Sequence, residues 1–467
     1  MRVQVLAQKP SKKKKKNIVQ AGDSFNTTIT TLPASFFSCF LLRNDCLSDW
    51  LYILSRDRLF FVVLFLFAFH SVRRSKKKKK VSLVTDSSLR ISISKRNPIF
   101  IMDIHRCRFV PFNPQAINAL AFSHPPSADL AGRGVPTLRL AVGRANGDVE
   151  IWNPLRGAWF QETVLRGGKD RSIEGLTWTL DPPEDGTDGN KIPGRLRLFS
   201  IGYSTAVTEW DLEKGRPLRH SSGNYGEIWC LAAQPRWQPT QRGKDGKLLP
   251  PAEGEYTGQH LAAGCADGSI VILSTADEDL KFLRLMRPST KRARVLSVTF
   301  QNRNTIVAGY ADSSIRLFDI RTGQLLRTIS LGKGPAGGPK ELLVWSVKCL
   351  PDGTIVSGDS AGEIRFWDGK NYSLIQRVQG HLADTLDIAV SANGDTVVSG
   401  GADQRTVIYR KKEEEKGDKK ARWAEVMHRR YHTHDVKTFA VYETKDISFV
   451  VSGGMSCAGF MACRDRR

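Results

Sequence analysis

The sequence repeats one short pattern, and this repetition limits what the chain can fold into. Each unit holds an apolar stretch, a second stretch that ends in Gly, a tight turn, and a third stretch that ends in an aromatic or aliphatic residue. The clearest copies are Thr305–Asp319 (TIVAGYADSSIRLFD) and Thr354–Asp368 (TIVSGDSAGEIRFWD). The glycines that mark the pattern are Gly143, Gly202, Gly264, Gly309, Gly358, Gly400 and Gly453.

A repeat of about 40–45 residues with four short strands is typical of a propeller blade. One such sheet cannot cover both of its own faces, so successive units are expected to pack on one another. We therefore predict an all-β fold, a seven-bladed β-propeller over residues 102–467. Its first strands are expected to begin near Ile117, Ile173, Ile228, Val295, Val344, Leu386 and Val436.

The two ends of the repeat region predict how the ring is closed. Ile104–Val110 has the pattern of a short strand, and we expect it to become the outermost strand of the last blade. An open ring would leave an unpaired strand edge, which folded proteins avoid. After Gly454 the turn and the alternating apolar pattern are weak. The last blade is therefore expected to be truncated.

Residues 1–101 differ from the remainder in charge and pattern. The 467 residues carry a formal charge of +23, of which residues 1–101, with 20 Lys+Arg and 5 Asp+Glu, supply +15. The runs Lys12–Lys16 and Lys76–Lys80 cannot fold on themselves, because like charges repel. The apolar run Leu59–Phe69 is shorter than the roughly 20 residues that cross a bilayer. Three interpretations stay open: a nuclear-localisation tail, a solvated disordered tail, and non-native coding sequence ahead of a true start at Met102.

The repeat also explains side chains that could otherwise suggest chemistry. The sequence holds no P-loop and no Cys-x-x-Cys. Aspartates in the turns are explained by side-chain bonds to the local backbone. We predict no catalytic residue, no metal site and no cofactor, and hence no enzyme. Trp229 and Trp345, in first strands, are expected in the core. The residues given a structural role in strands and turns are Trp152, Trp210, Asp211, Asp267, Asp312, Asp319, Trp367 and Asp368.

Two features stand out as candidate interaction surfaces. The first is a set of long segments between first and second strands, which are expected on one face: His124–Thr137, Asp181–Arg195 and Arg236–Gln259. Insertions on one face often mark a binding side, although tolerated surface loops explain them equally well.

The second feature is a basic connector ahead of the fourth blade, expected on the opposite face. Residues 281–294 hold six cations and no acid. Such a segment can follow a phosphate backbone, and the alternative is a set of solvated charges. The candidate contacts to RNA or to a protein partner are Arg284, Arg287, Lys291, Arg292 and Arg294.

The units resemble the WD40 family across residues 103–454. In the sixth unit, His381, Ser399 and Asp403 match the hydrogen-bonded set of that family, with Tyr409 at its tryptophan position. Met102–Phe122 resembles the opening of cirhin-type (UTP-four) WD-repeat subunits of the small-subunit processome. Further segments support the resemblance: Arg144–Trp152, Val207–Asp211, Lys291–Ser297 and Asp435–Thr438.

The cirhin-type resemblance implies a nucleolar, non-catalytic scaffold. Such proteins join other WD-repeat subunits in the UtpA subcomplex, which associates with the 5′ external transcribed spacer of pre-ribosomal RNA. They act in pre-18S rRNA processing, are linked to transcription of ribosomal DNA, and carry two propellers, of which this chain would cover the first. The resemblance implies neither a membrane nor a small-molecule substrate. The alternative is a substrate receptor of a cullin-type ubiquitin ligase, whose WD-x-Arg motif is approximated by Phe318–Arg321 (FDIR).

Overall fold

The computed structural model describes most of the repeat region and two short strands ahead of it. The described residues are 39–42, 50–53, 115–124, 136–154, 159–168, 172–182, 184–185, 191–192, 194–221, 226–238, 256–276, 279–288, 292–412, 422–443, 448–455 and 459–463. The predicted strand Ile104–Val110, the two lysine runs and the apolar run Leu59–Phe69 lie outside them. No helix in these ranges is long and apolar enough to cross a membrane.

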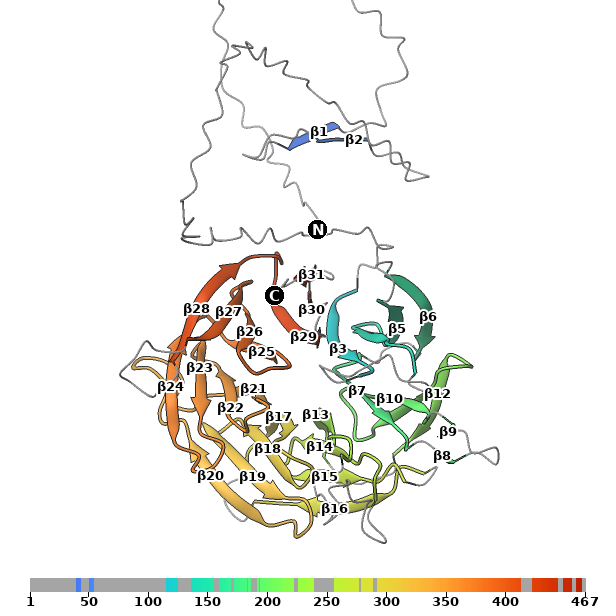
Figure 1. Cartoon of the computed structure of the whole chain (residues 1–467). Coiled ribbons are helices and arrows are strands. Elements are labelled where there is room, and N and C mark those ends of the chain that lie inside the picture. Colours follow the sequence, from blue (N-terminus) through green and yellow to red (C-terminus); the bar gives the residue numbers. More distant parts are fainter. Residues whose placement is uncertain are drawn as a thin grey trace, which may run out of the picture. The chain divides into compact units, whose positions relative to one another are not determined.

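The chain divides into two units. The smaller, Val5–Pro98, contains the antiparallel pair β1 (Cys39–Leu42) and β2 (Trp50–Ile53). The larger unit contains Ile99–Arg467 and is built of antiparallel sheets around a ring (Figure 1). Every regular element of the described residues is a strand, which confirms the predicted all-β architecture.

Six sheets of the larger unit have four strands each, and we number them blades 1 to 6. Blade 1 contains β3 (Ile117–Phe122), β4 (Leu140–Arg144), β5 (Asp148–Asn153) and β6 (Phe160–Arg166). Blade 2 contains β7 (Gly175–Leu180), β10 (Leu196–Ile201), β11 (Thr208–Asp211) and β12 (Arg216–His220). Blade 3 contains β13 (Ile228–Ala233), β14 (Leu261–Cys265), β15 (Ile270–Leu273) and β16 (Phe282–Met286).

The remaining blades follow the same order. Blade 4 contains β17 (Val295–Phe300), β18 (Thr305–Tyr310), β19 (Ser314–Asp319) and β20 (Leu325–Ser330). Blade 5 contains β21 (Val344–Cys349), β22 (Ile355–Asp359), β23 (Glu363–Trp367) and β24 (Leu374–Gln379). Blade 6 contains β25 (Thr385–Val390), β26 (Thr396–Gly401), β27 (Thr406–Lys412) and β28 (Arg422–Arg429). A last sheet contains β29 (Val436–Glu443), β30 (Ser448–Gly454) and β31 (Gly459–Cys463).

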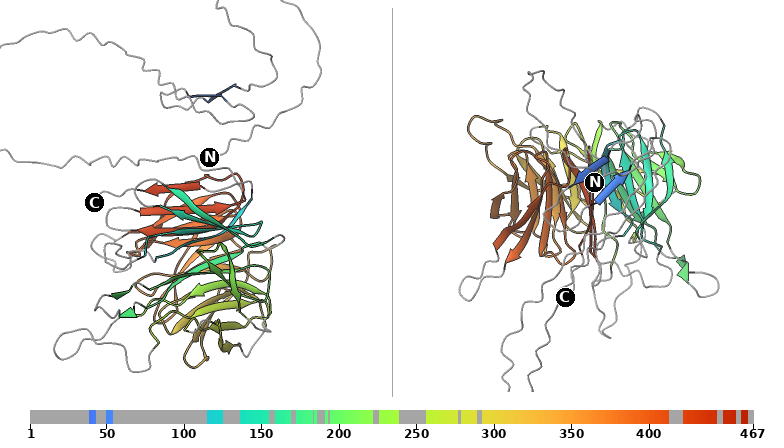
Figure 2. Two further views of the ribbon diagram at one scale, coloured as in Figure 1. Left: turned by 90° about the vertical axis from the view of Figure 1, so that its right-hand side faces the viewer. Right: turned by 90° about the horizontal axis from the view of Figure 1, so that it is seen from above.

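The first strand of each sheet lies at the centre of the ring and the fourth at its rim (Figure 1). Because neighbouring strands are antiparallel, the connectors that enter first strands share one face with the turns between second and third strands. We call this the connector face. The opposite, insertion face carries the loops between first and second strands, including the pair β8 (Glu184–Asp185) and β9 (Lys191–Ile192), which projects from one side of the ring in Figure 2.

A recurring close approach holds adjacent blades together. At Gly309 in β18, an added Cβ would lie 2.6 Å from Cγ1 of Val344, the first residue of β21, and 2.5 Å from Oγ of Ser297. Real Cβ atoms do not come this near other atoms, so glycine lets the next blade approach. The same glycine-to-β-branched contact recurs at Gly143–Ile173, Gly264–Val295, Gly358–Thr385, Gly400–Val436 and Gly453–Ile117. Gly202 is the exception, because it faces the carbonyl oxygen of Ser172.

The last sheet packs on blade 1 and closes the ring. Ala440 and Val451 join Ile117, Leu120 and other blade 1 residues in one buried apolar cluster. A polar contact accompanies this packing, since Lys437 Nζ donates to Asn118 Oδ1 at 3.0 Å. The two ends of the repeat region therefore meet.

The C-terminal segment differs from the sequence expectation of a weak pattern after Gly454. β31 pairs with β30 in register from Ser448↔Cys463 to Ser452↔Gly459. Main-chain pairing needs no alternating side-chain pattern, and the edge of β30 supplies the N–H and C=O groups. The last sheet therefore has three strands within the described residues.

The glycine contact gives a direct test of the blade interface. Replacing Gly309→Ala is expected to lower the free energy of unfolding by about 1–3 kcal/mol, because the new methyl group overpacks the contact between blades 4 and 5. Gly338→Ala is the matched control, since its added Cβ would meet only Pro335, at an ordinary 3.4 Å. Urea unfolding of both variants measures the difference. Equal stability of the two would contradict the close-approach explanation.

Candidate interaction surface

The predicted structural tryptophans lie in third strands and are buried. Trp210 donates from Nε1 to Ser200 Oγ at 2.8 Å, and Trp367 donates to Ser357 Oγ at 2.9 Å. Trp152 instead donates to Glu150 Oε2 at 3.0 Å on its own strand. Each indole thus fills a blade interface while its one polar hydrogen is bonded.

The predicted structural aspartates cap turns. Asp211 and Asp319 end their third strands, and Asp368 directly follows its third strand. Each accepts backbone N–H bonds from the next turn; Asp368 Oδ1 accepts from Lys370 and Asn371, both at 2.8 Å. These backbone bonds lower the pKa of all three carboxyls. The turns between second and third strands carry Asp267 and Asp312, which bond Ser269 and Ser314.

In blade 6 the structure brings together the side chains that match the WD40 set. His381 Nδ1 lies 2.9 Å from Asp403 Oδ1, and its Nε2 lies 2.7 Å from Ser399 Oγ. Ser399 Oγ in turn donates to the Tyr409 hydroxyl at 3.5 Å. The four groups thus form one hydrogen-bonded chain, and both ring nitrogens of the buried His381 are engaged in it, which gives His381 a structural role.

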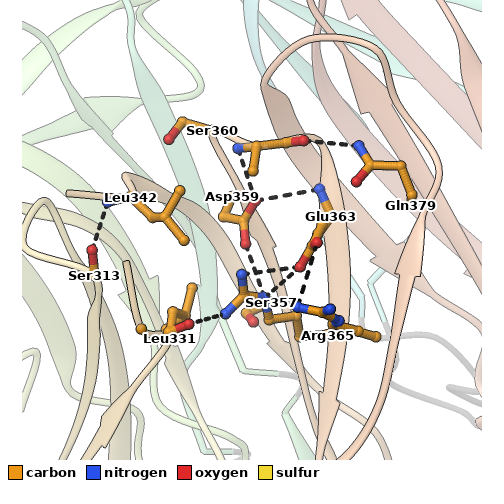
Figure 3. Close-up of polar contacts among 12 residues, drawn as sticks. Ser313, Leu331, Leu342, Ser357, Asp359, Ser360, Glu363, Arg365 and Gln379 are labelled. Atoms are coloured by element: carbon orange, nitrogen blue, oxygen red, sulfur yellow. Dashed lines mark hydrogen bonds and ion pairs between the residues drawn. The ribbon is translucent and has the colours of Figure 1, made fainter. Parts of the chain in front are cut away.

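Blades 1, 2, 4 and 5 use buried Arg–carboxylate pairs that the sequence analysis did not identify. In blade 5, Arg365 Nε lies 3.1 Å from Asp359 Oδ2 and donates to Glu363 at 3.0 Å, while Nη1 donates to the Leu331 carbonyl at 2.5 Å (Figure 3). Burial raises the pKa of Asp359, whereas the nearby Arg365 guanidinium opposes that shift. The corresponding pairs are Arg144–Glu150, Arg197–Glu209 and Arg316–Asp312.

One serine-hydrolase pattern in the sequence, Gly358–Gly362 (GDSAG), is explained by the same region (Figure 3). The nucleophile elbow needs a strand-to-helix turn. Here the pattern joins two antiparallel strands, and Ser360 Oγ accepts a bond from Leu343 N at 3.0 Å. The pattern therefore marks a structural turn.

Cys265 and Cys349 are poor nucleophiles because of burial. Burial raises the pKa of Cys265 to about 11 and that of Cys349 to about 12, so both thiols stay protonated near neutral pH. No group of three or more His, Cys, Asp or Glu side chains within the described ranges could hold a metal ion.

The structure places the arginines of the basic connector in two different parts of the molecule. Arg284 lies on the rim strand β16, where its Nη1 donates to the Thr322 carbonyl at 2.9 Å, so it does not belong to the connector face. Arg287, Arg292 and Arg294 do lie on that face and are exposed. Arg287 forms a 3.6 Å ion pair with Asp267. Lys291 lies outside the described residues.

Trp229 and Trp345 are half-buried, which corrects their predicted place in the core. Each tryptophan lies at an irregularity in the pairing of the first and second strands, between Ile228 and Cys230 in blade 3 and between Val344 and Ser346 in blade 5, where the regular ladder is interrupted. Trp345 Nε1 donates to Asp384 Oδ2 at 2.8 Å. The Arg294 guanidinium lies over the Trp229 ring, 4.0 Å from its centroid. Tyr203 packs edge to face on Trp229, with ring centroids 5.9 Å apart, and the sequence analysis did not identify it.

On the insertion face, the described ends of the long loops are bonded to neighbouring blades. Arg303 donates to the carbonyls of Pro235, Tyr256 and Gly258 at 2.6–2.9 Å. Gln259 accepts from Leu180 N at 2.9 Å. Blades 2, 3 and 4 thus hold the base of the blade 3 loop in place.

Four-stranded antiparallel blades around a ring, with Trp, Asp and His side chains bonded at repeated positions, define a WD-repeat β-propeller. The family model "WD domain, G-beta repeat" matches residues 372–410, which span β24 to β27. The match confirms the predicted WD repeat over these residues.

Within that class, the chain is similar to proteins named U3 small nucleolar RNA-associated protein 4. It is 40% identical to the Schizosaccharomyces pombe protein over 359 residues, covering 76% of this chain and 44% of that protein. It is 36% identical to the Saccharomyces cerevisiae protein, covering 76% of this chain and 42% of that protein. The human homolog is 29% identical, with 75% and 44% covered. The chain therefore spans less than half the length of these relatives.

Buried histidines predict acid sensitivity of this fold. Burial lowers the pKa of His432, which bonds Ser452 at 2.8 Å, from 6.5 to about 4. The unfolded chain therefore binds this proton first, and the stabilisation that is present above pH 6.5 is lost as the pH falls toward 4. His124 and His260 show the same lowering of pKa by burial.

Replacing His432→Gln is expected to reduce the fall in melting temperature across this pH range. His124 and His260 still lower the stability at acid pH, so the curve of melting temperature against pH should flatten without becoming level. Melting temperatures measured from about pH 7.5 to about pH 4 provide the comparison. Parallel curves for the wild type and the variant would contradict the assignment.

Proposed function

We propose that this chain is a non-catalytic scaffold of the small-subunit processome, acting in the nucleolus in pre-18S rRNA processing and linked to transcription of ribosomal DNA. The observation that carries the proposal is the similarity to two U3 small nucleolar RNA-associated proteins at 36–40% identity. The partners proposed are other WD-repeat subunits of the UtpA subcomplex and the 5′ external transcribed spacer of pre-ribosomal RNA. The fold supports this, because a rigid ring offers two broad faces and a rim for assembly.

The proposed architecture is a seven-bladed propeller in which the last sheet is the seventh blade. Within the described residues this sheet has the order β29-β30-β31, three strands where the other blades have four. We propose that Ile104–Val110 is its fourth strand, at the rim. This propeller is proposed to correspond to the first of two in the relatives, which are more than twice as long as the matched region. The proposed domain division is 1–101 and 102–467.

The ligase-receptor alternative has less support. In Phe318–Arg321, Asp319 accepts from Arg321 N at 3.0 Å and from Thr322 Oγ1 at 2.9 Å. Phe318 is fully buried. The motif is thus accounted for as a strand end and a capped turn, with Arg321 exposed.

Copurification distinguishes the two functions. The tagged chain is expected to enrich U3 small nucleolar RNA and the 5′ spacer over unrelated RNAs, and to enrich processome proteins over ligase adaptors. Arg321→Ala should leave this pattern unchanged, as should Arg327→Ala, an exposed rim control on the same blade. Capture of ligase adaptors that is lost only with Arg321→Ala would favour the receptor instead.

Two deletions test the proposed closing strand. Removal of residues 1–101 is expected to leave the melting temperature unchanged, because Ile104–Val110 is retained. Removal of residues 1–112 should lower the melting temperature by exposing the edge of the last sheet. Equal melting temperatures would rule out the closing strand without affecting the scaffold proposal.

A further inference from the structure

Three side chains from consecutive blades meet on the connector face. Tyr203 follows β10 of blade 2, Trp229 is the second residue of β13 in blade 3, and Arg294 immediately precedes β17 of blade 4. The guanidinium lies 4.0 Å from the Trp229 ring centroid, and the Tyr203 and Trp229 rings meet edge to face at 68°. We call this group the Tyr203–Trp229–Arg294 stack. Trp229 belongs to β13, one of the first strands at the centre of the ring (Figure 1).

Tyr203 is held in position although it is exposed. Its side chain is 62% exposed, a large fraction for an aromatic residue in a folded sheet protein. Partial burial and then the Glu174 carboxylate, which accepts a bond from its hydroxyl, raise the pKa of Tyr203. Glu174 is itself fixed by Ser172 at 2.5 Å and by Asn118 at 2.9 Å. The ring is therefore anchored at its polar end and open along its apolar part.

Exposed arginines lie on the same face, and Arg294 joins the Tyr203 ring through their shared contact with Trp229. Arg294 and Arg292 are exposed, and Arg287 is 58% exposed with only a 3.6 Å ion pair to Asp267. The Asp267 carboxylate pairs with Arg287, so Arg292 and Arg294 are the two arginines that this surface offers to a ligand. An exposed aromatic ring near exposed guanidinium groups is a combination that binds single-stranded nucleic acid, because bases stack on the ring while phosphates contact the cations.

We propose that the Tyr203–Trp229–Arg294 stack binds single-stranded RNA, with one base stacked on Tyr203 and adjacent phosphates on Arg292 and Arg294. This inference rests on the proposed function and adds the part of the surface that touches RNA. A paired helix hides its base faces, so duplex RNA could use only the cations. An acidic protein segment would likewise use the cations and leave the tyrosine ring without a partner.

The test measures binding of the full chain to a uridine oligonucleotide and to a duplex of equal length. All proteins carry Gln at Lys12–Lys16 and Lys76–Lys80, so that the lysine runs do not mask the site. Tyr203→Ala is expected to weaken single-strand binding by roughly 5- to 150-fold, since stacking on an aromatic ring contributes about 1–3 kcal/mol per base. Tyr203→Phe retains the ring and should restore affinity to within about twofold. Duplex binding should not respond to either change.

The cations are tested separately by salt dependence. Arg294→Gln should flatten the slope of log affinity against log salt by roughly 0.7 for one lost phosphate contact. Arg327→Gln on the rim strand β20 is the charge control, and Phe282→Ala on the rim strand β16, 49% exposed, is the aromatic control. Both controls should match the parent protein.

A second measurement does not depend on variant folding. Ultraviolet crosslinking of the parent protein to the uridine oligonucleotide, followed by peptide mass spectrometry, is expected to locate a crosslink at Tyr203 or Trp229. Unchanged single-strand binding by folded Tyr203→Ala, or crosslinks confined to other surfaces, would overturn the proposal. If Tyr203→Ala binds RNA normally but no longer copurifies with a processome protein, the surface would be assigned to a protein partner instead.

These outcomes are separable from failure of the proposed function. If the wild-type chain enriches U3 small nucleolar RNA but Tyr203→Ala binds RNA normally, only the present inference fails. If the wild-type chain enriches neither that RNA nor processome proteins, the scaffold proposal fails, whatever the oligonucleotide binds.

Discussion

The propeller depends on how closely the second strand of one blade can approach the residue that begins the next. At six interfaces a glycine meets Ile, Val or Thr, and any side chain in place of that glycine would collide with the neighbouring blade. Dispersion between packed atoms falls off within an ångström, so this distance determines how well every interface is filled. β-branched partners suit the contact because they have one preferred rotamer and bring two methyl or hydroxyl groups close to the backbone. These close contacts bring the apolar side chains of adjacent blades together into the buried clusters between them.

Buried polar side chains are bonded in two different ways in different blades. Blade 6 bonds the His381 ring to the Ser399 hydroxyl and to the Asp403 carboxylate, whereas blade 5 buries the Arg365 guanidinium against Asp359. A buried ion pair is tolerated only when its remaining donors are bonded. Arg365 meets this condition through the Leu331 carbonyl of the preceding blade's connector. The WD family model matches the unit with the histidine set, and the arginine units depart from that pattern while preserving the same architecture.

Much of the architecture could be predicted from the sequence because the same pattern of strands and turns occurs in several units. The observed first strands begin within about two residues of their predicted starts, since strand alternation and turn glycines are local properties. The interaction surface was harder to predict. Whether Trp229 is buried depends on Arg294 and Tyr203, which come from other blades, and local spacing does not contain that information. Arg284 was misplaced for a related reason: a run of cations gives no sign of where a strand ends and a connector begins.

The contact that closes the ring has a consequence for synthesis of the chain. Lys437 and Asn118 are 319 residues apart, whereas the contacts between blades 1 to 6 join segments that are close in sequence. At about 5–20 residues per second, a ribosome needs roughly 15–60 s to make the interval between them. During that time the blades can form in succession, but the open side of blade 1, with Ile117 and Leu120, has no cover. The nascent chain therefore exposes an apolar strand edge until its final strands emerge. Such an edge is a binding site for chaperones that act at the ribosome.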